Sequence, residues 1–249
     1  MLCYNKVGDD YMSKTTIEKI QNYLKNLLIS ILAFSIYFIL PQLEGILFEI
    51  LNINTETLSI NIKIIYSTIF DVLTMSLIIL LFYKTLKKDI QDIKINHKQY
   101  FSKCLRYWII GLFIMMISNL IISIISGGKI AGNQEAINTL FDISPLYIYF
   151  ASVIYAPIVE ELIFRKAIRN IIPNKYLFIA ISGLLFGSLH VIGNINAWYD
   201  ILYIIPYSAP GIIFAYMLYK TDNILVSMGF HFMHNGILIA LQFFMLIFG

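Results

Sequence analysis

The chain has 249 residues, of which 59% are apolar and only 13% are charged, and its formal net charge is +3. A mean hydropathy of +0.76 is too high for a soluble domain and indicates a polytopic membrane protein. The first two dozen residues lack an apolar stretch followed by a small-residue cleavage site, so we expect no cleaved signal peptide. Cys3 and Cys104 have neither metal-binding spacing nor an expected partner, which argues against a disulfide or a thiolate zinc site.

Apolar stretches long enough to cross about 30 Å of hydrocarbon recur along the chain. They lie at 26–48, 64–83, 105–125, 146–170, 176–194, 199–219 and 223–248. We therefore predict an all-α fold, a polytopic bundle of about seven transmembrane helices. It divides into an N-terminal segment at 1–25, N-terminal transmembrane helices at 26–144 and a transmembrane core at 145–249.

Lysine and arginine are distributed unevenly between the two sides of this predicted bundle. Sixteen of the 18 lie before the first span, at 84–106, at 165–175 or at Lys220, whereas the other exposed segments hold only Lys63 and Lys129. The positive-inside rule then places the N-terminus in the cytoplasm. The basic segments are interpreted first as determinants of this topology, and second as sites that recruit lipid head groups or substrate.

Two adjacent glutamates, Glu160 and Glu161, interrupt the predicted span at 146–170. A carboxylate at the bilayer centre costs on the order of 2.5 to 3.5 kcal/mol on insertion scales, so the pair needs partners, water or a chemical role. Other polar residues inside predicted spans are Asp71, His190, His231, His234 and Asn235. Asp71 has no evident partner at a matching position, and the rest gather in the C-terminal core.

Helix geometry separates the two glutamates. Glu161 and Arg165 are four residues apart and share a face, while Glu160 points about 100° away. We therefore expect Arg165 to pair with Glu161 as a structural counter-ion and Glu160 to project into a cavity as a general base. Pro157, which lacks a backbone N–H, is expected to kink this helix and open that cavity.

Two further predicted spans supply imidazoles and an amide. Gly183 and Gly187 predict a small-residue face that packs closely against another helix, with Phe186 in the core and His190 facing a neighbour. In the last span His231 and Asn235 lie one turn apart on one face. His234 lies about 60° to the other side and is expected to pack beside the site.

Depth in the bilayer tests whether these groups can meet. A helix ending at Arg165 would leave Glu160 only ~8 Å from the cytoplasmic end, against ~22 Å for His190. A helix that continues to about Ile172 moves Glu160 to ~18 Å, and His231 comes to ~14 Å. We therefore predict that the helix of the glutamates runs past Arg165.

This set of side chains supports two forms of hydrolytic chemistry. A glutamate and a histidine that converge on one water can deprotonate it, while a second histidine and an asparagine amide stabilise the developing oxyanion. Alternatively Glu160, His190 and His231 ligate a divalent metal such as zinc, with Glu161 as a base or a ligand-orienting group. The sequence leaves both open, so the cofactor is either a divalent metal or none.

Three motifs occur in order: EExxxR at Glu160, Glu161 and Arg165; FxxxH at Phe186 and His190; and HxxxN at His231 and Asn235. In this respect residues 145–240 resemble the CPBP or Abi family of intramembrane proteases, which includes the CAAX-processing endopeptidases. The resemblance implies a catalytic core at 145–249 that cleaves a peptide within or beside the membrane. It also implies that Glu160 and the motif histidines are catalytic. His234 lies outside the third motif.

Our main hypothesis is an intramembrane endopeptidase acting on a membrane protein or a peptide precursor, in bacteriocin or signal-peptide processing or self-immunity. A non-catalytic immunity or scaffold protein is the alternative, and an ion-coupled transporter is a third class. Expected partners are membrane lipid and the peptide substrate, with no nucleic acid. Abundant Ile, Asn and Lys suggest an AT-rich bacterial genome, so we expect a multi-pass protein of a bacterial cell membrane.

Overall fold

A computed structural model describes residues 5–248, with side chains described from residue 16 onward. Regular structure in this range is entirely helical, which confirms the predicted fold class. In chain order the elements are α1 (Asn5–Ile50), η1 (Thr55–Thr57), α2 (Ile60–Ile125), α3 (Gly132–Ile143), α4 (Pro145–Tyr149), η2 (Phe150–Tyr155), α5 (Ala156–Glu160), η3 (Glu161–Ala167), α6 (Ile168–Ile171), α7 (Lys175–Leu189), η4 (Ile192–Asn194), η5 (Trp198–Tyr203), α8 (Ile204–Thr221) and α9 (Ile224–Phe248). Cys104 is buried, and Cys3 lies outside the described residues.

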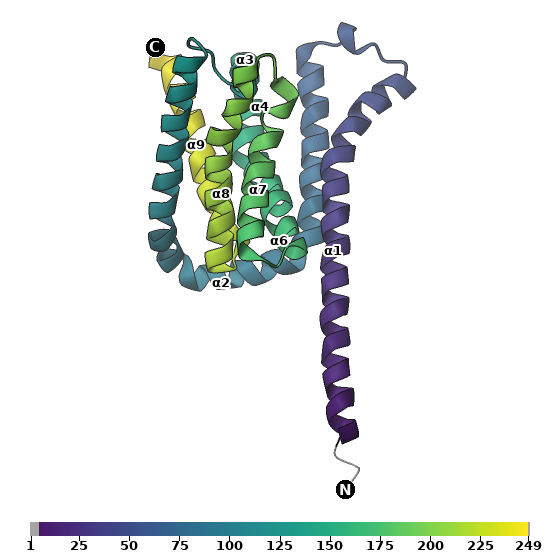
Figure 1. Ribbon diagram of the computed structural model, residues 1–249. Helices are drawn as coiled ribbons and strands as arrows, with labels where there is room; N and C mark the ends of the chain where they lie inside the picture. The colour runs from purple at the N-terminus through teal and green to yellow at the C-terminus, as the bar shows by residue number, and fades with distance from the viewer. Residues whose placement is uncertain (1–4, 249) are drawn as a thin grey trace.

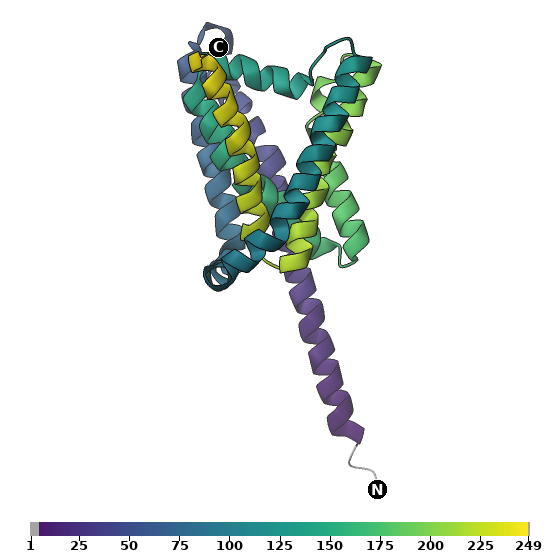
Figure 2. The ribbon, with the colours of Figure 1, turned by 90° about the vertical axis from the view of Figure 1, so that its left-hand side faces the viewer.

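Within the described residues, 6 helices are long and apolar enough to cross a membrane. One of them, α2, holds both predicted spans 64–83 and 105–125. The ribbon of α2 descends, runs across the base of the bundle and rises again (Figures 1 and 2). The basic segment 84–106, here called the connector, forms the stretch across the base as a continuation of the helix. The seven predicted crossings therefore correspond to six helices, one of which crosses twice.

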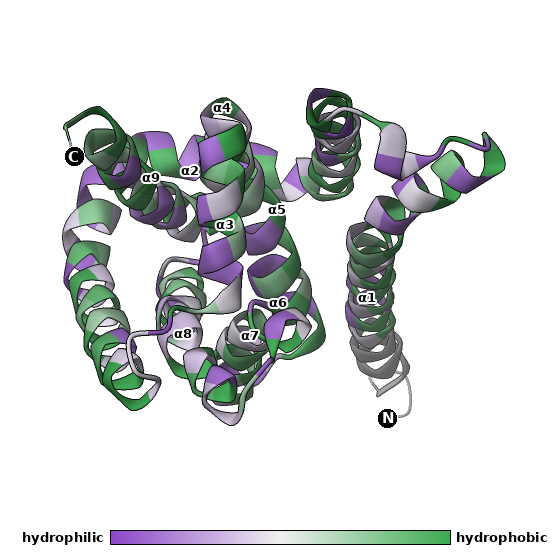
Figure 3. Ribbon diagram, turned by 90° about the horizontal axis from the view of Figure 1, so that it is seen from above, coloured by the Kyte–Doolittle hydropathy of each residue, from purple (hydrophilic) through white to green (hydrophobic). Residues whose placement is uncertain are grey.

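Apolar side chains cover the outer surface of these helices, as expected for a bundle surrounded by lipid. In the most apolar stretch of α1 only 11% of the residues are buried, and the same is true of α2. Viewed from above, hydrophobic positions run along the helices, and α1 lies at one edge of the bundle (Figure 3). The first two helices thus flank the C-terminal core.

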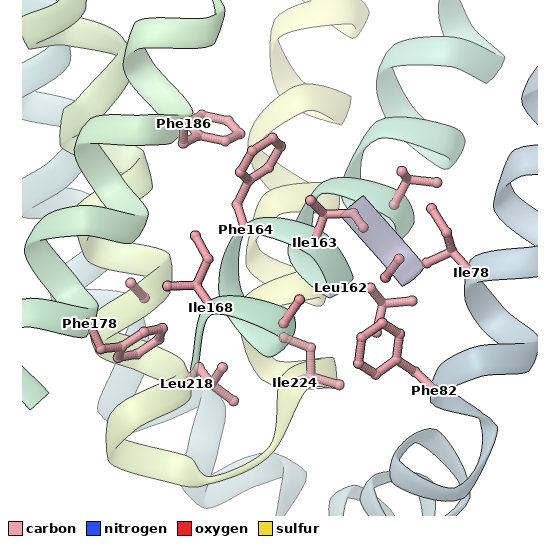
Figure 4. Close-up of a cluster of buried hydrophobic side chains, with 14 residues drawn as sticks. Ile78, Phe82, Leu162, Ile163, Phe164, Ile168, Phe178, Phe186, Leu218 and Ile224 are labelled. Atoms are coloured by element: carbon pink, nitrogen blue, oxygen red, sulfur yellow. The ribbon is translucent and has the colours of Figure 1, made fainter. Parts of the chain in front are cut away.

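The main hydrophobic core forms around η3, which carries Glu161 and Arg165. Leu162, Ile163 and Phe164 are at most 1% exposed. Side chains from four other helices close over them (Figure 4): Ile78 and Phe82 of α2, Phe178 and Phe186 of α7, Leu218 of α8 and Ile224 of α9. The helix of the glutamates is therefore the central element of the bundle, and the other helices are packed on it.

Elements α4 to α6 form one continuous helical segment from Pro145 to Ile171. The helix ends at Ile171, and the extended conformation of the next residue, Ile172 (φ −109°, ψ 99°), fits a residue that precedes a proline. The prediction that this helix runs past Arg165 to about Ile172 is confirmed. This length allows the glutamates to reach the depth of the histidines on α7 and α9.

Helices α7 and α8 pack closely through the predicted glycine face. A Cβ atom added at Gly183 would lie 2.8 Å from the backbone nitrogen of Ile212, and one at Gly187 would lie 2.7 Å from that of Ser208. Both distances are shorter than side chains tolerate. These glycines therefore fix the approach of α7 to α8, which in turn places Phe186 and His190.

Candidate active site

The predicted pair between Glu161 and Arg165 is present at the centre of the bundle. Arg165 Nε lies 3.4 Å from Glu161 Oε1, and both side chains are fully buried. The guanidinium also lies over the Phe186 ring, 4.5 Å from its centroid, and donates to Ser182 Oγ at 3.4 Å. Because a lone buried charge would be costly, each of these two side chains serves as the counter-ion of the other.

His231 of α9 lies between the two glutamates. Its Nδ1 is 3.0 Å from Glu161 Oε1, a hydrogen-bond distance, and its Nε2 is 3.7 Å from Glu160 Oε2. The imidazole is 4% exposed and the Glu160 side chain 14% exposed, so Glu160 is the more accessible carboxylate. The expected difference between the glutamates is therefore present: Glu161 is fully buried in an ion pair with Arg165, and Glu160 is partly accessible.

The hydrogen bond to Glu161 determines which nitrogen of His231 is available. An ionised carboxylate can only accept hydrogen bonds. Nδ1 of His231 therefore carries the ring proton and donates a hydrogen bond to Glu161. In the neutral ring Nε2 is then a bare acceptor directed toward Glu160. At 3.7 Å the two groups are too far apart for a direct hydrogen bond.

His190 lies at the C-terminal end of α7, where it contacts the Phe186 ring that also contacts His231. Its Nδ1 donates to the carbonyl oxygen of Phe186 at 2.9 Å, which leaves Nε2 free to accept. The Phe186 ring is 4.5 Å from the His190 ring and 5.9 Å from the His231 ring, centroid to centroid. Tyr207 of α8 stacks on His190 at 5.0 Å, a contact that sequence reasoning missed.

Asn235 satisfies a carbonyl that Pro157 leaves free. The N–H of Ala156 donates to the carbonyl of Ala151, five residues earlier, as in a π-helix. The next carbonyl in that register, Ser152 O, would require an N–H at position 157, and proline has none. Asn235 Nδ2 donates to Ser152 O at 2.8 Å instead. The amide therefore joins α9 to the helix of the glutamates and keeps its second N–H available.

Two other predicted polar residues lie apart from this cluster. His234 is buried against aromatic rings, 6.4 Å from Trp108 and 6.3 Å from Phe214 between ring centroids. Asp71, which has no evident partner from sequence spacing, accepts a hydrogen bond from Tyr147 at 3.3 Å. It thereby links α2 to α4. The partner could not be identified from spacing because the two residues are 76 positions apart.

The three residues predicted as metal ligands do not come together in the structure. Among residues with described side chains, no three His, Cys, Asp or Glu groups lie close enough together to hold a metal ion. Glu160 and His231 face each other, and the Phe186 ring contacts both His190 and His231. The three candidates Glu160, His190 and His231 do not form a metal site in this arrangement, and no chemical step below uses one.

The fold and the site together define a multi-pass membrane protein with a Glu–His–Glu cluster buried in its helical core. Comparison with known families gives a more specific result. Residues 142–237 match the family model described as Type II CAAX prenyl endopeptidase Rce1-like. This segment contains all the glutamates, histidines and the asparagine of the cluster, and the match confirms the family resemblance inferred from the three motifs. Helices α1 and α2 lie outside the match.

Two curated bacterial proteins are similar to the chain. "Putative membrane peptidase YdiL" of Bacillus subtilis (strain 168) is 28% identical over 173 residues, covering 66% of this chain and 66% of that protein. "Membrane-embedded CAAX protease MroQ" of Staphylococcus aureus (strain USA300) is 26% identical over 148 residues, covering 54% and 56%. The aligned residues thus span less than two thirds of either relative. No solved structure matches the chain.

Proposed function

We propose that this protein is an intramembrane endopeptidase of a bacterial cell membrane, in which Glu160 and His231 activate the hydrolytic water. One observation carries the proposal: His231 is held by Glu161 at 3.0 Å so that its acceptor nitrogen faces Glu160 at 3.7 Å. A structural ion pair would need only Glu161 and Arg165. The second carboxylate, Glu160, is not part of that pair and forms none of the described hydrogen bonds, whereas His231 also stacks on the Phe214 ring at 5.0 Å between ring centroids.

In the proposed reaction a water molecule is hydrogen-bonded to both Glu160 and His231. The Glu160 carboxylate takes a proton from the water, and the oxygen attacks the carbonyl carbon of the scissile peptide bond. The carbonyl oxygen becomes an oxyanion. As the C–N bond breaks, the proton moves from Glu160 to the leaving nitrogen, so that the products are one carboxyl and one amino terminus.

Asn235 is the proposed oxyanion donor. One N–H of its amide is used by Ser152 O, and the second can donate to the developing charge. A neutral His190 is less suited to this role, because its Nδ1 proton already binds the Phe186 carbonyl. We propose that His190 instead accepts a hydrogen bond from water or from a substrate N–H through Nε2.

The substrate class follows from the depth of the site. Glu160 and His231 lie inside helices that cross the membrane, so the scissile bond must reach them from a segment that itself enters the bilayer. A membrane protein or a membrane-associated peptide precursor meets this requirement. The matched family is described as a CAAX prenyl endopeptidase and one relative as a CAAX protease, so a prenylated substrate is one member of the proposed class.

The proposal is tested with Glu160→Gln and His231→Gln in the full-length protein, at matched membrane levels, with precursor processing as the readout. Glu44→Gln is the matched control, because Glu44 is another carboxylate in a membrane-spanning helix but contacts only Ser67 among the hydrogen bonds described for it. We expect both site variants to lose processing and the control to retain it. Full processing in both site variants would leave the non-catalytic scaffold as the better account.

Metal dependence is tested separately on purified protein. Metal analysis before and after chelation, together with the processing rate, distinguishes a metal-activated water from one activated by Glu160 and His231 alone. On the proposed mechanism the rate survives chelation. A loss of activity that zinc restores would instead assign Glu160 and His231 to a metal ion, with its remaining ligands brought in by rearrangement.

A further inference from the structure

The helix that carries His231 is capped by a residue from a distant part of the chain. Helix α9 begins at Ile224, where the first backbone N–H groups have no partner within the helix. Asp89 of the connector supplies one, because its Oδ2 accepts from Ile224 N at 2.9 Å. Asp89 is only 3% exposed. A buried carboxylate at this position also interacts favourably with the positive end of the helix dipole.

Asn223 extends this contact into a hydrogen-bond network of Asp89, Asp92 and Asn223, here called the clamp. The asparagine is 1% exposed. Its Nδ2 donates to Asp89 O at 2.9 Å and to Asp92 Oδ2 at 2.7 Å, while its Oδ1 accepts from Leu225 N at 3.0 Å. Asp92 is held in turn by Tyr100 at 2.9 Å. Each polar group of the Asn223 side chain is thus used to join the connector to the first turn of α9.

Beyond the clamp, apolar side chains of the connector pack against α9, where Val226 and Phe230 are each 4% exposed. Further along, Phe101 stacks on Phe230 at 5.5 Å, but an apolar cavity of about 400 Å³ lies between the connector and α9. Its walls come from both elements, with Ile93 and Phe101 on the connector and Val226 and Gly229 on α9 among them. Apolar contacts are non-directional, whereas hydrogen bonds are directional, so the clamp specifies the position of the first turn of α9 more narrowly than this apolar packing does.

A shift at the clamp is transmitted to the site along the helix. His231 follows Ile224 by seven residues, which is about 10 Å at 1.5 Å per residue along a rigid helix. Its hydrogen bond with Glu161 at 3.0 Å tolerates little displacement. A rotation or slide of α9 at its first turn would move the imidazole away from both carboxylates.

We propose that Asp89 and Asn223 are positioning residues that fix the register of α9 and so hold His231 between Glu160 and Glu161. Asp89 lies on the connector, outside the residues 142–237 that match the protease family. The connector thereby gains a role in the site beyond membrane topology. The consequence for catalysis rests on the proposed function, whereas the consequence for the geometry of His231 does not.

The test compares Asp89→Ala, which removes the cap, with Asp89→Asn, which retains an acceptor of equal capping strength. Lys88→Ala is the matched control: it removes the neighbouring connector contact to Asp222, an ion pair at 3.5 Å whose side chains are 71% and 83% exposed. The full-length protein is labelled with ¹⁵N-histidine in lipid nanodiscs. The chain has 4 histidines, so the His231 signal is assigned by its loss in His231→Gln.

In the wild type we expect one tautomer of His231, protonated at Nδ1. In Asp89→Ala this signal should shift toward a mixture of tautomers. The processing rate at saturating substrate should fall by about tenfold, the scale of a lost N-cap, with KM little changed. Asp89→Asn should restore both, and Lys88→Ala should alter neither.

An unchanged His231 signal in folded Asp89→Ala would overturn the proposal. If Asp89→Ala does not fold, Asp92→Ala provides the milder change, since it removes one acceptor of Asn223 and leaves the Ile224 cap. An unchanged His231 signal in that variant would equally overturn the proposal. If the wild type processes no substrate, the endopeptidase proposal fails, and the histidine spectra alone still decide whether the clamp positions His231.

Discussion

Replacing Asn235 by alanine should destabilise the protein by removing the partner of the Ser152 carbonyl. The amide donates to this oxygen at 2.8 Å, and Ser152 lies partly buried in a helix that crosses the membrane. Leaving a buried backbone acceptor without a partner costs about 1 to 3 kcal/mol. We expect Asn235→Ala to lower the free energy of unfolding by this amount.

A second substitution tests the cause. Pro157→Ala supplies an N–H at the position from which the π-helical register would serve Ser152 O. In the Asn235→Ala background this N–H should recover much of the lost stability. In the wild-type background Pro157→Ala should change the free energy of unfolding little, because Asn235 already donates to the Ser152 carbonyl. The two substitutions should therefore couple by about 1 kcal/mol or more, as expected for residues that share one partner.

The assay is reversible unfolding of purified protein in mixed detergent micelles, followed by circular dichroism. Gln242→Ala is the control: it removes another hydrogen bond of α9, the one donated to Asn138 Oδ1 at 2.8 Å, which Pro157 cannot influence. Additive effects of Asn235→Ala and Pro157→Ala would refute the explanation. Recovery of stability without recovery of processing would also separate the structural role of Asn235 from its proposed role as oxyanion donor.

Two further substitutions test the packing of the site. Arg165→Leu should destabilise the protein by about 3 to 5 kcal/mol, because it leaves the fully buried Glu161 carboxylate unpaired, and adding Glu161→Leu should restore much of that loss. A double variant no more stable than Arg165→Leu would contradict this account. Gly187→Val should cost at least about 1 to 3 kcal/mol, since its side chain would collide with the α8 backbone. Gly193→Val, with open space around it, should stay within about 0.5 kcal/mol of the wild type, and equal losses in the two glycine variants would exclude close packing as the cause.

Much of the architecture could be predicted because the bilayer imposes simple rules on a sequence. Apolar length determined the spans, and the spacing of Glu161 and Arg165 determined their pairing. The required depth of the glutamates correctly indicated a helix that continues to about Ile172. Sequence could not show that the spans at 64–83 and 105–125 belong to one bent helix, because hydropathy registers crossings and not the continuity of the backbone between them.

The sequence alone also determined which polar residues needed a partner, since charge and imidazole inside an apolar helix are costly wherever the helices pack. Only the tertiary structure decided which residues are the partners of these polar side chains. It placed His231 between Glu160 and Glu161, brought the Phe186 ring against both His190 and His231, and directed Asn235 to the carbonyl that Pro157 leaves free. These contacts join residues that are distant along the chain. Their identity depends on the rotation and depth of whole helices, which are fixed by packing and by caps such as Asp89, and not by local spacing.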